Sequence, residues 1–476
     1  MPIVEIPFNG GDAVARAQFS NFQNRINLYP EIETAGARSR VVMYGTPGLE
    51  LLVRLEIGQD VRGMCFGSDG NIYAVCGTSV YKVVPSTGVV TNLGTVPAGS
   101  YVQMATNLTQ VIIVGGFTAS WYVITLSTGV LSVVTGGGYP SPETVSFLDG
   151  YFILNNKGTG QFFITGINDA TSFDILDFAT AESNPDSILN AFVDHRELWL
   201  FGGLSVEVWY NSASSTGFPF ERRLDAILEV GCAAKYSVTK IDNTVYWLSN
   251  QFTVVRANGY SPEIISTTAL SNEISGYSVK EDAIAYGYYE RGHAFYVLTF
   301  PSEDKTWVFD ASTGEWHKRE SVGMGRHLSS CLAFDGKTNY IGSINDGAIY
   351  KMSEAYGSED GRKINREMTT PYIHDREIRL KMKSLRLVMQ VGVGDNGSDP
   401  EDNDPKFSLS YSDDGGNNWS YPQTVSLGKI GEFSTEVEFR RLGLFRFRLF
   451  KVQANTSRPV VFIKAIADIS PTELGT

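Results

Sequence analysis

Residues 110–130, QVIIVGGFTASWYVITLSTGV, contain the pattern from which the fold of this protein can be read. Two runs of apolar and aromatic residues, QVIIV and SWYVITL, flank a Gly-Gly turn, and a Ser-Thr-Gly triplet follows the second run. Runs rich in β-branched and aromatic residues favour strands, and Gly and Ser favour the tight turns between them. The segment therefore predicts two short strands joined by a turn.

Copies of the first run recur along the chain as NIYAV, QVIIV, GYFIL, ELWLF, TVYWL, HAFYV and TNYIG. Their third residues, in steps of 39 to 49 residues, are Tyr73, Ile112, Phe152, Trp199, Tyr246, Phe295 and Tyr340. A period of roughly 40–50 residues with about four strands is typical of a β-propeller blade. One blade cannot bury both faces of its sheet alone, so we expect six or seven blades packed around an axis over residues 56–355.

After residue 355 the pattern changes to alternating polar and apolar residues. The strand-like runs are SLRLVMQVG from Ser384, KFSLSYS from Lys406, LFRFRLFKVQ from Leu444 and PVVFIKAIADI from Pro459. In the third run the alternation is imperfect, because Leu444 and Phe450 fall in the same set as the arginines. Alternation still favours strands with one buried face. We expect a jelly-roll-like β-sandwich over residues 356–476, which makes the chain all-β.

The N-terminal residues 1–55 form an extended segment that is punctuated by Gly and Pro. Such a segment is suited to add a strand to the C-terminal domain or to a neighbouring subunit, so we assign it to the platform that the sandwich forms. We expect that deletion of residues 1–29 blocks assembly and leaves the propeller folded. A short helix is expected near residues 179–189.

Composition narrows the functional classes. The net charge of −13 argues against tight nucleic-acid binding, which depends on Lys and Arg, but suits a protein that DNA passes without sticking. No apolar run approaches the roughly 18 residues that span a membrane, and residues 1–11 do not resemble a signal peptide. The four cysteines are Cys65, Cys76, Cys232 and Cys331, and they form neither a CxxC pair nor a zinc-binding pattern with a nearby His. We therefore expect them to be buried free thiols in a protein that folds in a reducing cytoplasm.

Residues 412–419, SDDGGNNW, have the form S-x-D-x-G-x-x-W, which resembles the Asp-box hairpin of sialidases and other propellers. In that motif the Asp accepts hydrogen bonds from the loop backbone, Gly makes the tight turn and Trp packs beneath. The resemblance implies a structural role for Ser412, Asp414, Gly416 and Trp419. Here the motif lies outside the predicted propeller.

Two charged clusters have more than one interpretation. The first is a cluster of arginines interleaved with aromatic residues: Arg440, Arg441, Arg446 and Arg448. These arginines can face DNA phosphate, pair with acidic residues of a partner subunit, or form a solvated strand face. The acidic stretch DNGSDPEDND, from Asp395 to Asp404, is expected to be a solvated loop. A calcium site is the alternative, although the spacing does not match an EF-hand loop.

Catalytic motifs do not stand out. The sequence has no HExxH, no GxSxG elbow, no P-loop and no GxGxxG that follows a strand and opens a helix. A glycosidase needs two carboxylates at a defined separation, and nothing selects a pair among the 52 acidic residues. His195 and His317 occupy predicted turns and are expected to be exposed. We therefore expect neither an enzyme, nor a cofactor, nor a metal.

The chain ends carry a family resemblance. Six short patches carry it, in this order along the chain: MPIVEIPF at the start, NLYPE from Asn27, GTPGLELL from Gly45, TPYI from Thr370, the hairpin at Ser412 and the FRFRL strand. Together they resemble the packaged-DNA-stabilising proteins, also described as tail hub or nozzle proteins, of short-tailed bacteriophages.

The resemblance implies a structural virion protein, made in the host bacterial cytoplasm and not inserted in a membrane. It implies a homo-oligomer, expected to be a hexamer, below the portal and its adaptor ring. Such a ring extends the DNA channel, retains the packaged genome, passes double-stranded DNA without specific binding, and docks tail fibres, spikes or a needle. The alternative is a receptor- or glycan-binding, or glycosidase-like, propeller of the phage tail.

Overall fold

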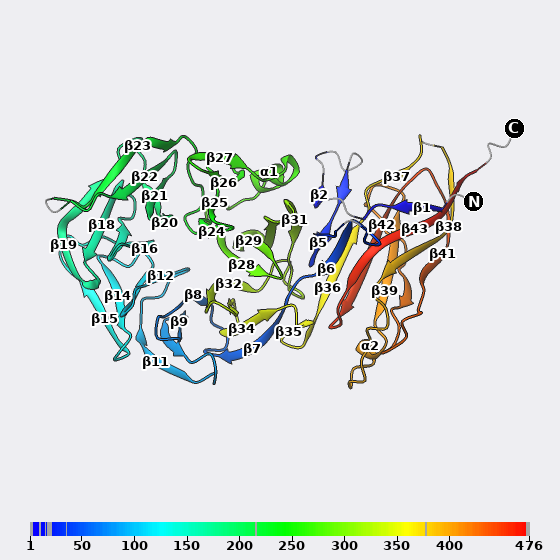
Figure 1. Cartoon of the computed structure of the whole chain (residues 1–476), viewed down its shortest axis with the longest axis horizontal. Helices are drawn as coiled ribbons and strands as arrows, with labels where there is room; N and C mark the ends of the chain where they lie inside the picture. The colour runs from blue at the N-terminus through cyan, green and yellow to red at the C-terminus, as the bar shows by residue number, and fades with distance from the viewer. Residues whose placement is uncertain are drawn as a thin grey trace.

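The computed structural model describes residues 3–8, 11–14, 16, 21–34, 36–214, 217–376 and 378–472. A β-propeller, on the left in Figure 1, lies beside a β-sandwich on the right, where both chain ends are found. The expected all-β fold with these two domains is confirmed. No helix among these residues is long and apolar enough to cross a membrane.

Seven antiparallel blades of four strands form the propeller in the described part of the chain: five are separate sheets, and the last two are parts of a 15-stranded sheet. The first three blades are β8 (Val61–Phe66), β9 (Ile72–Cys76), β10 (Ser79–Val83) and β11 (Val90–Thr95); β12 (Gln103–Thr106), β13 (Gln110–Val114), β14 (Ser120–Thr125) and β15 (Val130–Thr135); and β16 (Val145–Leu148), β17 (Tyr151–Asn155), β18 (Gln161–Gly166) and β19 (Asp169–Thr180). The next two are β20 (Ile188–Asp194), β21 (Glu197–Gly202), β22 (Val206–Asn211) and β23 (Phe220–Leu228); and β24 (Thr239–Ile241), β25 (Thr244–Leu248), β26 (Val254–Asn258) and β27 (Ser261–Ile264). The sixth is β28 (Ile284–Glu290), β29 (His293–Phe300), β30 (Lys305–Asp310) and β31 (Glu315–Lys318), and the seventh is β32 (Ser329–Phe334), β33 (Asn339–Ser343), β34 (Ala348–Ser353) and β7 (Gly48–Arg54).

The recurring run found in the sequence is the second strand of every blade, from β9 to β33. The first strand of each blade lies innermost, and β32 of the last blade packs beside β8 of the first. Apolar side chains fill the space between neighbouring sheets: Tyr73 and Val75 of the first blade pack with Val111 and Ile113 of the second. This burial between blades explains why a period of one blade is visible in the sequence.

The seventh blade is closed by a strand from the N-terminal segment. Strand β7 pairs with β34, with Leu49 opposite Met352, and on its other side Leu49 pairs with Glu359 of β35 (Ser358–Glu359). Gly48 permits this crowding, because a Cβ there would lie 2.3 Å from the carbonyl oxygen of Tyr356. The boundary expected at residue 55 therefore differs from the structure, in which residues 48–54 belong to the propeller.

The sandwich combines both ends of the chain, as expected. One sheet has the order β41 (Val437–Phe445), β38 (Leu380–Met389), β43 (Val461–Pro471), β6 (Val41–Gly45) and β5 (Leu28–Ile32), and β1 (Ile3–Ile6) also pairs with β43. The facing layer contains β39 (Lys406–Ser412), β40 (Gln423–Ser426), β42 (Phe447–Thr456), β37 (Ile373–His374) and β36 (Arg362–Thr369). One core lies between the layers, and it includes Ile6 from the N-terminus with Leu385, Phe439 and Phe450.

The run LFRFRLFKVQ is not one strand. It comprises the end of β41, a break at Arg446, and then β42; β41 pairs with β38 in one layer, whereas β42 pairs with β36, β37 and β39 in the other. The chain crosses between layers here, so the side-chain alternation changes phase. This crossing is the physical reason for the imperfect alternation in the sequence.

Helices are few in the described chain: α1 (Thr268–Ser275), α2 (Pro400–Asn403) and the 3-10 turn η1 (Pro301–Glu303). Helix α1 is capped by the preceding residue Thr267, whose side chain accepts a hydrogen bond from the Leu270 amide, and the helix buries Leu270 and Ile274. The helix expected near residues 179–189 is wrong. Strand β19 extends to Thr180, and Pro185 disfavours a helix in the segment that follows.

Candidate functional site

The feature that ties the two domains together is a continuous set of paired strands, seen between the domains in Figure 1. Strand β4 (Arg25–Ile26) pairs with β31 of the sixth blade, where Ile26 lies opposite Lys318. On its other side β4 pairs with β36, which pairs in turn with β42 of the sandwich. The β2 (Ala13–Val14) and β3 (Phe22–Gln23) hairpin precedes β4. Propeller and sandwich are therefore joined through main-chain hydrogen bonds as well as side chains.

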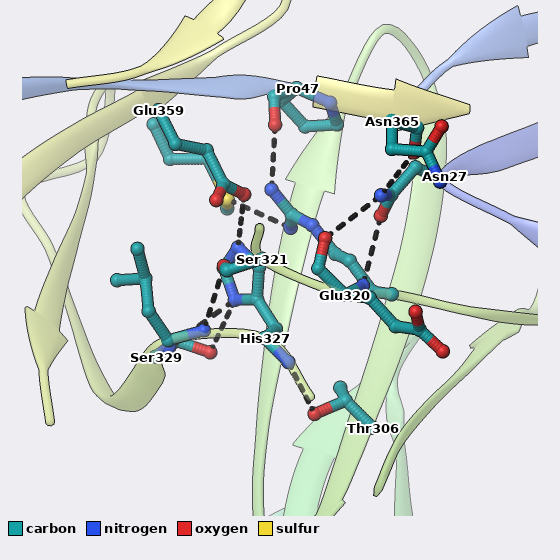
Figure 2. Close-up of polar contacts among 12 residues, drawn as sticks. Asn27, Pro47, Thr306, Glu320, Ser321, His327, Ser329, Glu359 and Asn365 are labelled. Carbon is teal, nitrogen blue, oxygen red and sulfur yellow. Dashed lines mark hydrogen bonds and ion pairs between the residues drawn. The ribbon is translucent and has the colours of Figure 1, made fainter. Parts of the chain in front are cut away.

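Asn27 is the central polar residue of this junction (Figure 2). Its side-chain amide donates to the carbonyl oxygens of Glu320 and Asn365, each at 2.8 Å, and its Oδ1 accepts from the Glu320 amide at 3.0 Å. Asn27 has a φ of 55°, a left-handed conformation that Asn tolerates better than most residues. One buried side chain thus connects the N-terminal segment with the propeller and the sandwich.

Arg319 precedes Glu320, the propeller partner of Asn27, and is fully buried. Its Nη2 donates to the carbonyl oxygen of Pro47 at 2.6 Å, and its Nη1 lies 3.2 Å from the sulfur of Met352. Arg319 follows the sixth blade, whereas Pro47 and Met352 belong to the N-terminal connection and the seventh blade. The guanidinium therefore holds the closing strand β7 against both blades.

Figure 2 also shows a chain of Ser, His and Glu side chains that is superficially similar to a hydrolytic triad. Nδ1 of His327 lies 2.7 Å from Ser329 Oγ, and Nε2 lies 3.2 Å from Glu359 Oε1. All three residues are buried, and burial lowers the pKa of His327 to about 4. Ser329 Oγ also lies 2.8 Å from the Tyr286 hydroxyl. With the serine 1% exposed, this arrangement offers no route to a substrate and is structural.

Strand β5 places aromatic and ionisable groups over the sixth blade. The Tyr29 ring lies 5.0 Å from that of His293 and 5.2 Å from that of Phe295, and its hydroxyl donates to Glu354. His317, expected in an exposed turn, lies on β31 beneath this strand and is fully buried. Burial, with positive charges nearby, lowers the pKa of His317 well below 6.5. The second predicted turn histidine, His195, is about half exposed, as expected.

The Asp-box-like hairpin is held by hydrogen bonds among its own residues. Ser412 Oγ donates to Asp414 Oδ1 at 2.7 Å and accepts from the Gly416 amide at 2.9 Å. The Asn418 amide donates to Asp414 Oδ1 at 2.9 Å, and such donors lower the pKa of Asp414 to about 2. Trp419 is half-buried, and its ring lies 6.3 Å from that of Phe22 in the N-terminal hairpin.

The four arginines of the predicted cluster separate into two groups. Arg448 is buried and pairs with Asp413 through two nitrogens, at 2.6 and 2.7 Å. Its guanidinium also lies 3.9 Å from the centre of the Tyr411 ring. Arg448 is therefore an internal anchor of the sandwich and is shielded from solvent. The exposed members are Arg440, Arg441 and Arg446.

The acidic loop from Asp395 to Asp404 is tied down by its own carboxylates. Asp395 pairs with Arg458 at 3.0 Å, Asp399 pairs with Lys363 at 2.7 Å, and Asp402 accepts from Thr456 at 3.0 Å. Across the described residues, no group of three or more His, Cys, Asp or Glu side chains is placed to hold a metal ion. Each cysteine is a free thiol, and burial raises the pKa of Cys232 to about 12.

Sequence reasoning missed the junction residues Asn27, Arg319, His327 and Glu359. They lie in three separate parts of the chain, near residues 27, 319–327 and 359, and their spacing follows no motif. Asn27 is the first residue of NLYPE, one of the segments that carry the family resemblance. That resemblance was the one signal in the sequence that pointed to a junction residue.

Solved structures with some similarity include a chain of the "Crystal Structure of Mitotic Checkpoint Complex", which is 13% identical, covers 68% of this chain and 95% of its own, and has a TM-score of 0.42. "YCF48 bound to D1 peptide" is 11% identical, covers 65% of this chain and 98% of its own, and has a TM-score of 0.41. No curated protein matches the sequence.

Family models match nearly the whole chain. The model described as "Bacteriophage P22 Gp10, beta-propeller" matches residues 4–356, and the model described as "Bacteriophage P22 Gp10, beta-sandwich" matches residues 365–470. The first model alone covers well over half of the sequence, and the two follow each other in the order of the observed domains. The chain thus belongs to the bacteriophage P22 Gp10 family, the phage-stabilising proteins.

Proposed function

We propose that this protein is the tail hub, or nozzle, of a short-tailed bacteriophage. Six copies form a ring below the portal and its adaptor, extend the DNA channel, and help to retain the packaged genome until ejection. The ring also docks fibres, spikes or a needle. Membership in a phage family that matches both domains supports a structural role in the virion.

The observation that carries the proposal is the junction of the two domains. A channel wall must keep its shape while DNA under pressure passes through it. A flexible hinge between the two domains would allow the wall to deform. Here β4 and β36 connect the sixth blade to the sandwich, while the Asn27 side chain bonds across the same boundary. Closed propellers have only short free edges, which adds to the stiffness.

The surface chemistry is compatible with a channel that does not retain DNA. A net charge of −13 disfavours phosphate binding, and the one dense arginine cluster loses Arg448 to the sandwich interior. The exposed Arg440, Arg441 and Arg446 are proposed to pair with acidic residues of a neighbouring copy. The buried Ser–His–Glu arrangement supports a non-enzymatic role.

Electron cryomicroscopy of the assembled particle at side-chain resolution tests the proposal. We expect six copies of this chain directly below the adaptor, with the sandwich toward the adaptor and the arginines at subunit contacts. Finding the chain at the tail periphery, or not finding it in the particle, contradicts the proposal and favours a receptor-binding propeller.

A further inference from the structure

A polar groove of about 460 Å³ lies on the outer face of the sandwich, over strands β36, β42, β39 and β40. We call it the sandwich groove. Alternate residues of these strands, such as Phe407 and Val452, fill the sandwich core. The residues between them point away from the core. Amides and hydroxyls prevail among those that line the groove, namely Asn365, Ser408, Thr424, Gln453 and Asn455.

The acidic stretch of residues 395–404, which includes helix α2, forms one wall of the sandwich groove. This wall is tied to the sheet by Lys363, which pairs with Asp399 at 2.7 Å, and by Thr456, which donates to Asp402 at 3.0 Å. The groove is therefore held in shape before a ligand arrives, which lowers the entropic cost of binding. Its volume lies within the range of ligand pockets.

Two asparagines at the centre of the groove have no evident structural task. Asn365 of β36 lies directly opposite Asn455 of β42, although Asn is depleted in strands. Among the described residues, neither side chain forms a hydrogen bond with another residue, and Asn365 bonds through its main chain alone. A residue that breaks a local rule without a structural gain indicates a functional position.

Charge does not select the ligand of the sandwich groove. Lys406, Glu401 and Asp404 line it, and Lys363 beside it pairs with both Glu401 and Asp399 at 2.7 Å. Among these five groups, negative charges exceed positive ones by one. This balance disfavours DNA, whose binding requires an excess of Lys and Arg, and provides little attraction for a basic peptide.

The lining also disfavours a protein partner, because protein interfaces are anchored by aromatic or apolar side chains in their centre. Pro400 is the one apolar residue among the described residues that line the groove. Side-chain amides offer donors and an acceptor together, and sugar hydroxyls both donate and accept. The lining therefore matches a neutral ligand that is rich in hydroxyl groups.

We propose that the sandwich groove binds a neutral saccharide. The amides of Asn365 and Asn455 pair with neighbouring hydroxyls of one sugar, and Thr424 on β40 contacts the next. This would be a second function of the chain, and it does not depend on the proposed hub, because it requires the groove alone.

Binding of the purified full-length protein to a microarray of bacterial surface polysaccharides tests this inference. The array carries neutral polysaccharides, acidic polysaccharides and double-stranded DNA. We expect binding to at least one neutral polysaccharide, and neither to the acidic ones nor to DNA. Binding to none of the neutral polysaccharides, or to acidic ones or DNA alone, overturns the inference.

Substitutions then locate the site. The double variant Asn365→Ala and Asn455→Ala removes both amides, and we expect its affinity for the bound polysaccharide to fall at least fivefold. Thr424→Ala, at an exposed position, should fall about twofold and guards against a folding defect in the double variant. Asn258→Ala, at an exposed asparagine of β26 in the propeller, is the matched control and should bind as the wild type does.

Unchanged affinity in both the double variant and Thr424→Ala overturns the inference, as does an equal loss in Asn258→Ala. None of these outcomes bears on the hub, because the position of the chain in the assembled particle tests the hub separately.

Discussion

The propeller and the sandwich use the chain in opposite ways. Six of the seven blades are built from four strands that follow one another directly, so most of their pairing is local. The main sheet of the sandwich joins strands from the two ends of the protein, and Ile6 pairs with Ala465. The seventh blade lies between these extremes, because its fourth strand comes from residues 48–54.

This difference indicates which part of the chain contributes to the stability of both domains. A blade can form from local contacts, but closure of the ring and completion of the sandwich both depend on the N-terminal segment. Loop closure over hundreds of residues costs conformational entropy before any contact repays it. We therefore expect changes in the first 54 residues to affect both domains, and the following predictions test this comparison.

The largest effect is expected from two deletions, of which only the longer also removes the rest of β5, β6 and the closing strand β7. Deletion of residues 1–29 retains β7, so the propeller stays folded while assembly is blocked. Deletion of residues 1–54 removes the strand that closes the ring, so we expect loss of cooperative unfolding by circular dichroism and rapid proteolysis of the propeller. Equal protease resistance of the two truncated proteins would show that β7 does not close the ring.

Arg448 tests the sandwich alone. Arg448→Leu removes a buried guanidinium whose partner Asp413 remains exposed to solvent, and loss of hydrogen bonds between charged groups costs about 1.5–3 kcal/mol. We expect faster hydrogen exchange in sandwich peptides than in propeller peptides. The control Arg440→Leu removes an exposed charge that pairs with Glu438, and we expect a change below about 1 kcal/mol.

The buried His327 predicts a pH effect on the propeller side of the junction. Its pKa is about 4 in the folded protein and 6.5 ordinarily, so the unfolded chain binds the proton first as the pH falls. Stability is thus complete above pH 6.5 and decreases between pH 6.5 and 4, by up to about 3 kcal/mol. Denaturant unfolding at several pH values should give a flatter profile for His327→Gln, whereas His374→Gln, at an exposed position, should retain the wild-type slope.

Asn27 tests the coupling between domains. Asn27→Ala removes three hydrogen bonds at the junction and places Ala at a φ of 55°, which together cost about 2–3 kcal/mol. The control Asn27→Gly keeps the backbone conformation accessible and isolates the hydrogen bonds. We expect propeller and sandwich to unfold in more clearly separate steps in both variants. A single unchanged transition would mean that the paired strands alone couple the domains.

The smallest effect is expected at the Asp-box-like hairpin, whose contacts are local. Ser412→Ala removes the hydroxyl that bonds Asp414 and the Gly416 amide, at a cost of about 1 kcal/mol. Urea unfolding should show this decrease without a change in propeller exchange. Thr424→Ala, at an exposed site on β40, is the control for a neutral substitution. A larger loss would mean that the hairpin supports the N-terminal contact between Trp419 and Phe22.

Much of the fold was predictable from residues that are neighbours in sequence. The seven runs marked seven second strands, and the hairpin at Ser412 formed from its own side chains. Positions that depend on distant partners were not predictable. His317 was placed in an exposed turn because nothing nearby indicates that β5 covers it. Arg448 was grouped with Arg440, Arg441 and Arg446 because its partner Asp413 lies at the end of the neighbouring strand β39, 35 residues away in the sequence.

By itself, the sequence determined the strand content, the period of the blades and the change to a second domain, because turns and side-chain alternation are encoded within a few residues. Tertiary structure alone decided that β7 closes the seventh blade, that the chain changes layers at Arg446, and that Asn27, Arg319 and His327 meet at one junction. These features arise from contacts between segments far apart in the chain, and no local pattern of residues records which segments will meet.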